Sequence, residues 1–196
     1  MSGTLSGNFF EAAEISSNVT TRSTATMGNR IIRREIPGQF WNIKLTTTAL
    51  DQDEMMDLFA FLTAQKGQYE SFGIIPPIHG TTRGTGVSGV PLITQAYAAG
   101  ASTIRANGGL GTLKTGDFIK FSNHDKIYML ITDVNQDASS EDTFEIYPAL
   151  FSPVNTSTTI IYNNVEFKVM LNSNVSTFKT QSDGIYKLEI DVREDI

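Results

Sequence analysis

The sequence predicts a mainly β protein with one helix, in which a small OB-like β-barrel is inserted into a larger β domain. Three observations lead to this class. Thr, Ser, Asn and Gly are frequent and charged residues make up only 18% of the 196 residues, a composition that favours strands and turns. Short strand-like runs recur between turn residues over residues 91–162. Only one segment has the period of an amphipathic helix.

The N-terminal residues 1–29 are polar and rich in Ser and Thr, interrupted by Phe9 and Phe10. We expect an extended arm that includes one strand, and the arm either orders against a neighbouring subunit or stays loosely attached. The segment has no basic start followed by an apolar run, so it does not resemble a secretory signal. No apolar stretch approaches the roughly 20 residues that a membrane-spanning helix needs, and we expect no membrane insertion.

The first clear strand pattern follows this arm. Trp41, Ile43 and Leu45 alternate with polar residues, which is the period of a half-buried strand. A run that contains Ile31, Ile32 and Ile36 precedes them, and a Pro-Gly pair at 37–38 separates the two runs. A Pro-Gly pair between two such runs predicts a hairpin that turns at that pair.

The one convincing helix is expected over residues 51–66. Asp51 is a good N-cap, and Glu54 stands three residues later, where it closes a capping box. Gly67 supplies the C-terminal stop. An apolar stripe with spacing i, i+3, i+4 and i+7 consists of Met55, Leu58, Phe59 and Leu62. A single amphipathic helix buries such a stripe by lying across a sheet.

The rest of the chain divides by composition. Residues 79–89 are polar and rich in Gly, and the short strand-like runs after them predict a small closed barrel. Residues 165–171 and 186–193 return to long alternating strands, which need an apolar partner in the N-terminal half. We therefore expect an arm of residues 1–29, a domain of residues 30–77 plus 163–196 and an inserted barrel domain of residues 78–162.

Several classes of function find no support in the sequence. Without cysteine there is no disulfide and no thiolate metal site. The formal net charge of −6 argues against affinity for nucleic acid driven by phosphate neutralisation. The two histidines, His79 and His124, are not spaced as a metal pair. We expect no metal, no cofactor and no catalytic residues, and hence not an enzyme, because no nucleophile, base and oxyanion donor occur together.

Motif-like strings have simpler explanations. Residues 84–89 match G-x-G-x-x-G, but a strand-like run follows where a dinucleotide site needs a helix, so we interpret them as a linker. The Lys-Thr-Gly at 114–116 and the Ser-x-x-Lys at 176–179 stand in the wrong order for penicillin-binding elements. The barrel aromatics Tyr97, Tyr128 and Tyr147 are candidates to face a ligand, although aromatic residues are common in strands.

The order of these elements resembles that of the distal tail protein (Dit) family of long, non-contractile-tailed phages (siphophages), and is similar to the branch whose insertion is an OB-fold. The segments that carry the resemblance are QFWNIKLTTT with DEMMDLFAFLTAQKGQYESFGIIPP, LKTGDFIKFSNHDKIYMLITDVNQ with FEIYPALFSP, and VEFKVMLNSN with SDGIYKLEIDVREDI. They fall within residues 30–196 and leave the arm unexplained.

This resemblance implies a β-sandwich or partial barrel that forms a ring, with a hexamer expected, at the distal end of the tail in the virion. The ring would join the tail tube protein to a tip or baseplate hub protein, and DNA would pass through its lumen without specific binding. We expect the helix at 51–66 and the loops at 46–51 and 172–184 to face other subunits. Two alternatives remain open: a carbohydrate-binding module that contacts the host surface through the barrel, and another tail subunit such as a tube or minor tail protein.

Overall fold

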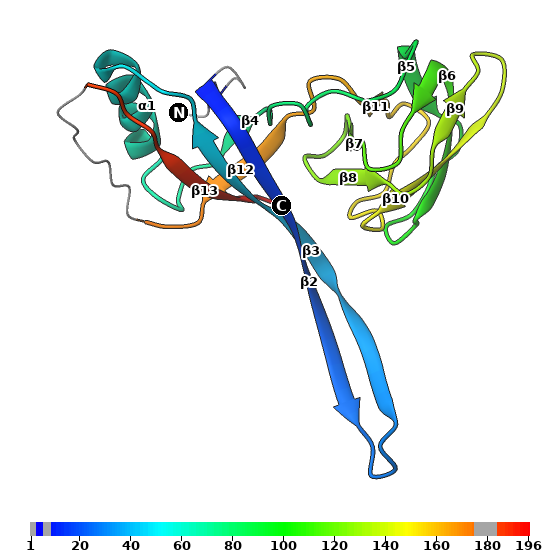
Figure 1. Ribbon diagram of the computed structural model, residues 1–196. Helices are drawn as coiled ribbons and strands as arrows, with labels where there is room; N and C mark the ends of the chain where they lie inside the picture. Colours follow the sequence, from blue (N-terminus) through cyan, green and yellow to red (C-terminus); the bar gives the residue numbers. More distant parts are fainter. Residues whose placement is uncertain (1–2, 6–8, 175–183) are drawn as a thin grey trace.

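The computed structural model describes residues 3–5, 9–174 and 184–196, and it confirms a mainly β protein with one helix, α1 (Gln52–Ala64). The strands form two sheets that lie side by side, and a two-stranded ribbon projects far beyond both (Figure 1). Within the described residues, no helix is both long and apolar enough to cross a membrane.

The first sheet combines strands from both ends of the chain. Its six strands are β1 (Thr4–Leu5), β2 (Phe10–Ala25), β3 (Ile31–Thr47), β4 (Phe72–Ile74), β12 (Phe167–Leu171) and β13 (Glu189–Glu194). They lie in the order β1-β4-β12-β13-β3-β2, parallel between β1 and β4 and antiparallel elsewhere. The two C-terminal strands therefore occupy the middle of the sheet, between β4 and β3.

The predicted alternation in β3 is confirmed by burial. Ile43 and Leu45 are 0% exposed, and they pair with Val192 and Ile190 of β13. Side chains on one face of the sheet therefore form a core with the buried side of α1, to which Met55, Leu58 and Leu62 contribute.

The predicted start of α1 is confirmed in detail. Asp51 is the N-cap, and its Oδ1 accepts a hydrogen bond from the Glu54 backbone N–H at 2.9 Å. The Glu54 Oε2 in turn accepts from the Asp51 N–H at 3.2 Å, which completes the capping box. Past the end of the helix, Gly67 has a φ of +67°, a conformation that glycine adopts without strain.

The hairpin predicted to turn at residues 37–38 is wrong, because β3 runs straight through this pair. The strand pairs with β2 on both sides of the pair, across a register shift, and the turn lies at residues 26–30 instead. Pro37 is tolerated because β13 pairs only with residues 42–46 of β3 among the described residues, which leaves the far edge of β3 open at the proline. Gly38, with a φ of +133°, lies beside a register shift in the β2–β3 ladder.

Residues 10–25, predicted to lie in a polar arm, form the long edge strand β2. The ladder extends from the Phe10–Thr47 pair beside α1 to the Ala25–Ile31 pair at the turn. The N-terminal half of β2 and the C-terminal half of β3 belong to the sheet, and the rest of the ribbon is the projection seen in Figure 1.

The second sheet is the nearly closed antiparallel barrel that the sequence predicted. Its strands are β5 (Ser88–Ile93), β6 (Thr103–Leu113), β7 (Phe118–Phe121), β8 (Ile127–Leu130), β9 (Val134–Gln136), β10 (Asp142–Tyr147) and β11 (Ile160–Ile161). The path is β11-β7-β8-β10-β6-β5, with β9 on β6. A single bridge, Leu92 to Thr159, and a hydrogen bond from the Ile93 N–H to the Thr158 carbonyl bring the two end strands together.

Candidate assembly surface

The projecting part of the ribbon, residues 19–36, is the most unusual surface of the molecule, and we call it the exposed hairpin. Every residue in it is exposed. Large apolar side chains are among them: Met27, Ile31, Ile32 and Ile36 are 110%, 56%, 56% and 38% exposed. A two-stranded ribbon has no core of its own, so apolar side chains on it indicate a surface that another molecule covers.

The exposed hairpin is also basic, in contrast to the rest of the chain. Four arginines against Glu35 give it a formal charge of +3. Because the whole chain carries −6, the residues outside the hairpin carry −9. Opposite charges on two parts of one molecule favour association between copies when the two parts cannot meet within a copy.

Behind the hairpin, an apolar junction joins the barrel to the first sheet. Phe118 and Ile127 belong to barrel strands, yet they pack into the core of the first sheet. The Phe118 ring meets Trp41 edge-on at 5.2 Å between centroids and Phe167 at 5.3 Å. Trp41 Nε1 also donates to the Ile127 carbonyl at 3.0 Å. Buried aromatic contacts of this kind fix the barrel against the sheet rather than leaving it on a linker.

A buried ion pair lies at the same junction. Lys126 Nζ donates to Glu194 Oε2 at 2.5 Å, and their side chains are 2% and 0% exposed. Lys126 Nζ also donates to the Gln39 carbonyl at 2.8 Å. The Glu194 carboxylate accepts from the backbone N–H groups of Ile127 at 2.8 Å and Trp41 at 3.2 Å. Every group of the pair therefore has partners, as a buried charge requires.

Burial dominates the electrostatics of this pair. It raises the pKa of the Glu194 carboxyl, while the attraction of Lys126 opposes that shift. Burial likewise lowers the pKa of the Lys126 amine, against the attraction of Glu194. The predicted alternating strand at residues 186–193 stops one residue short of Glu194, so this buried role was not predicted. A signal was present, because Glu194 continues the inward alternation of Ile190 and Val192.

A pocket of about 220 Å³ opens beside the junction, between β1, β4 and the barrel. Its charged groups are already paired: Asp125 accepts from Lys120 at 2.8 Å and from Lys168 at 3.2 Å. The bond from Lys120 is the main cause that lowers the pKa of Asp125. Glu166 accepts from the Thr4 hydroxyl at 2.5 Å. The carboxylates of the pocket are therefore held by internal ion pairs and a hydrogen bond.

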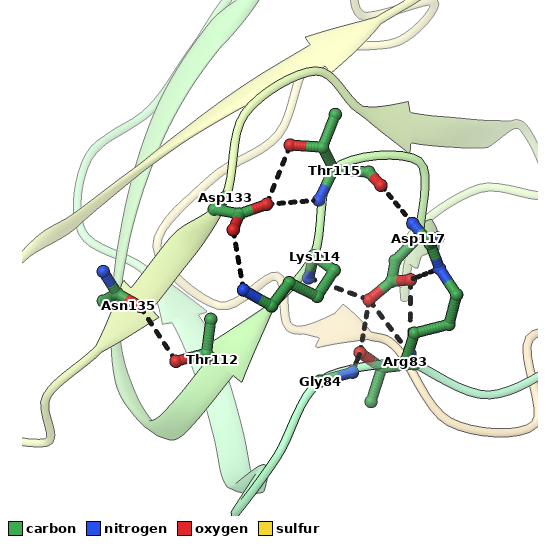
Figure 2. Close-up of polar contacts among 9 residues, drawn as sticks. Arg83, Gly84, Thr112, Lys114, Thr115, Asp117, Asp133 and Asn135 are labelled. Carbon is green, nitrogen blue, oxygen red and sulfur yellow. Dashed lines mark hydrogen bonds and ion pairs between the residues drawn. The ribbon is translucent and has the colours of Figure 1, made fainter.

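The turn before β7 is held by two aspartates (Figure 2). Asp117 accepts from the Lys114 N–H at 2.9 Å and from Arg83 Nε at 3.1 Å. Asp133 accepts from Lys114 Nζ at 2.8 Å and from the Thr115 N–H at 2.8 Å. The bond from Lys114 is the main cause that lowers the pKa of Asp133. The Lys-Thr-Gly string at 114–116 thus builds a turn and tethers the segment that leads into the barrel.

His124 is held as a structural residue. It stacks on Phe121, and its Nε2 lies 2.8 Å from the Tyr128 hydroxyl. Its Nδ1 lies 2.8 Å from Asn123 Oδ1, and the Asn123 Nδ2 donates to the Pro153 carbonyl at 2.9 Å. This orients the amide oxygen toward the imidazole, so Nδ1 carries the proton and Nε2 accepts from Tyr128. Burial lowers the pKa of His124.

The three candidate tyrosines lie in different environments. Tyr128 is 0% exposed, and its hydroxyl accepts from the Phe151 N–H at 2.9 Å, so it has no surface to offer a ligand. Tyr97 is half-buried, and its hydroxyl accepts from the Arg105 N–H at 2.9 Å. Tyr147 is half-buried at the end of β10. The fold therefore leaves two of the three with accessible surface.

Other sequence motifs have structural explanations. Residues 84–89 lead into β5 rather than into a helix. In the described ranges, no group of three or more His, Asp or Glu side chains is placed to hold a metal ion. The Ser-x-x-Lys at 176–179 and most of the loop at 172–184 lie outside the described residues.

Comparison with known families supports the resemblance within the barrel. Residues 92–165 match the family model described as distal tail protein pb9, B domain. The match covers less than half of the chain and includes β6 to β11 with the end of β5. A search of curated proteins found no match. The resemblance to a phage distal tail protein is therefore confirmed for residues 92–165.

Proposed function

We propose that the chain is a structural subunit of a phage tail, a distal tail protein whose copies form a ring between the tail tube and the tip or baseplate hub. The observation that carries this proposal is the match of residues 92–165 to a domain of a distal tail protein. That segment is inserted between strands of one sheet, as a domain embedded in a second, ring-forming domain would be. We place the protein at the distal end of the tail in the virion.

The shape of the first sheet supports assembly. β2 and β1 are its edge strands, and each edge has backbone groups that a neighbouring strand can pair. The exposed hairpin extends one of these strands beyond the body of the molecule (Figure 1). A ring of such subunits, with six copies expected, would close the open edges and enclose a channel through which DNA passes.

Electron microscopy of intact phage particles labelled with a gold-conjugated antibody against the chain tests this proposal. Gold at the distal end of the tail is the expected result. Gold along the whole tail would assign the chain to the tube instead. If the protein is present with its epitope accessible but no particle is labelled, a place in the tail is refuted. Native mass spectrometry of the purified chain then gives the number of copies in the ring.

Binding of host carbohydrate by the barrel is a second candidate, because Tyr97 and Tyr147 retain accessible surface. Titration with surface glycans from the host, followed by NMR shifts of the barrel amides, tests it directly. Saturable shifts around these two residues would support it, and unchanged spectra would remove it without affecting the ring proposal.

A further inference from the structure

Two arginines of the exposed hairpin face each other without any counter-charge. Arg22 of β2 and Arg34 of β3 are directly opposite in the ladder, so their side chains lie on the same face of the ribbon. Like charges in such a pair destabilise a ribbon. Within the described residues, neither arginine has an ion pair or a side-chain hydrogen bond. This arrangement indicates a face that meets carboxylates of another surface.

Apolar side chains flank the pair. Ile32 and Ile36 stand two residues before and after Arg34, which places them on the same face of β3. They are 56% and 38% exposed. We call Arg22, Ile32, Arg34 and Ile36 the hairpin patch. A surface complementary to the hairpin patch needs two carboxylates next to an exposed apolar side chain.

The outer side of α1 has this composition. Asp53, Met56 and Asp57 follow the spacing i, i+3, i+4, so they share one face of the helix. All three are exposed, Met56 by 47%. Whereas Asp51 and Glu54 are occupied in the capping box, Asp53 and Asp57 have no ion-pair partner in the described part of the chain. We call Asp53, Met56 and Asp57 the helix patch.

The two patches cannot meet within one copy. They lie toward opposite ends of β3, since the hairpin patch includes residues near its start at Ile31 and α1 begins after its end at Thr47. At about 3.3 Å per residue, the strand places Arg34 roughly 40 Å from Thr47. Figure 1 shows the helix and the hairpin tip at opposite ends of the long ribbon. A contact between the patches therefore joins two copies head to tail, the type of contact that generates rings.

We propose that the hairpin patch of one copy docks on the helix patch of the next copy. The inference rests on the proposed ring and names the contact that builds it. The formal charges support a second copy as the partner, because the hairpin carries +3 and the rest of the chain −9. Each docking event covers the exposed isoleucines and gives both arginines a carboxylate.

The absence of cysteine makes a direct test possible in the full chain. Thr24→Cys and Ala60→Cys place thiols beside the two patches and leave every charge in place. With a short bis-maleimide, this double variant should give a ladder of covalent multimers on a denaturing gel. The matched control combines Thr24→Cys with Ser139→Cys, which is exposed in the barrel. A ladder no stronger than that of the control overturns the proposal, as does equal cross-linking of Thr24→Cys alone, which indicates hairpin-to-hairpin contact.

Charge reversal provides a second test of this contact. Adding Arg34→Glu to the cysteine pair should reduce the ladder at least tenfold, and adding Asp57→Arg to that variant should restore it. Restoration also shows that the reversed chain is folded. If Arg34→Glu leaves the ladder unchanged but abolishes retention on duplex DNA, the arginines serve nucleic acid and the proposal fails. A ring seen by native mass spectrometry without the ladder refutes this contact alone, whereas monomers at every concentration refute both the contact and the ring.

Discussion

Lys126 and Glu194 form an ion pair of 2.5 Å in which neither side chain is more than 2% exposed. The pair joins the start of β8 in the barrel to the end of β13 in the first sheet. Charges buried to this degree depend on each other, because the loss of one leaves the other in a medium that solvates it poorly.

Glu194→Ala should therefore destabilise the folded chain by about 3–5 kcal/mol, since Lys126 is left buried without its counter-charge. The backbone N–H groups of Trp41 and Ile127 lose their acceptor in the same substitution. Urea denaturation followed by circular dichroism measures the change. Glu189→Gln, on the exposed side of the same strand, is the matched control and should stay within about 0.5 kcal/mol. Equal effects of the two substitutions would contradict a structural role for the pair.

Lys126→Met in the Glu194→Ala background gives a further test of coupling. Because the stranded charge is removed, the double variant should be less destabilised than the sum of the two single variants, by at least about 1 kcal/mol. Additive effects in the same urea experiment would show that the two residues act independently.

Phe118→Ala should loosen the barrel and the first sheet together. The residue belongs to β7, but its ring packs on Trp41 and Phe167 in the core of the other sheet. Truncation of a buried phenylalanine costs about 3–5 kcal/mol. Hydrogen exchange should show faster amide exchange in β3 and β12 as well as in β7. Phe151→Ala, at a ring that is 57% exposed, is the control and should leave exchange in these strands unchanged.

Capping residues, turn residues and strand alternation predicted the parts of this fold that depend on contacts between neighbours in the sequence. The start of α1 follows from the cap at Asp51, which acts within a few residues, whereas the helix ends at Ala64, two residues before the predicted end at 66. The barrel followed from turn residues between short strands, although its closure depends on the bridge between Leu92 and Thr159, which no local pattern indicates. The expected class was correct because alternation and turn spacing are local properties.

The failures concern long-range pairing. A turn at residues 37–38 was the natural interpretation of Pro-Gly, and it was wrong because β13 leaves one edge of β3 free there. The inward position of Glu194 was visible in the alternation of β13, but its partner Lys126 lies in the barrel, 68 residues away in sequence. The exposed hairpin could not be recognised from the sequence either. Its exposure depends on where the other strands of the sheet end, and that is set by long-range pairing.

Gly84 allows the segment before β5 to approach the barrel backbone, which predicts a specific cost for any side chain there. A Cβ at this position would lie 1.6 Å from the Thr112 carbonyl oxygen, so the segment must move. Gly84→Ala should lower stability by at least about 2 kcal/mol, in thermal denaturation converted to free energy. Gly28→Ala is the matched control, because no atom lies within 4 Å of its added Cβ and little change is expected. A neutral Gly84→Ala would show that the segment can move away from Thr112 without loss of stability.

His124 predicts a loss of stability on mild acidification. Burial lowers its pKa in the folded chain below the ordinary value of 6.5, so the unfolded chain binds a proton first as the pH falls. The stability that His124 contributes is complete above about pH 6.5 and declines from there until the pH reaches the folded pKa. The proton would enter at Nε2, where the Tyr128 hydroxyl now donates, and would break that hydrogen bond.

The test compares thermal unfolding at about pH 7.5 and about pH 5.8, a range in which ordinary carboxyl groups stay ionised. The raised pKa of Glu194 acts in the opposite direction, because a folded chain that holds its proton longer loses stability as the pH rises. His124→Gln keeps Glu194 unchanged, so the difference between the two proteins isolates the histidine. The native chain should lose more stability than His124→Gln on going to the lower pH. Equal losses would mean that His124 titrates alike in the folded and unfolded chains, which its stacking on Phe121 and its bond to Tyr128 argue against.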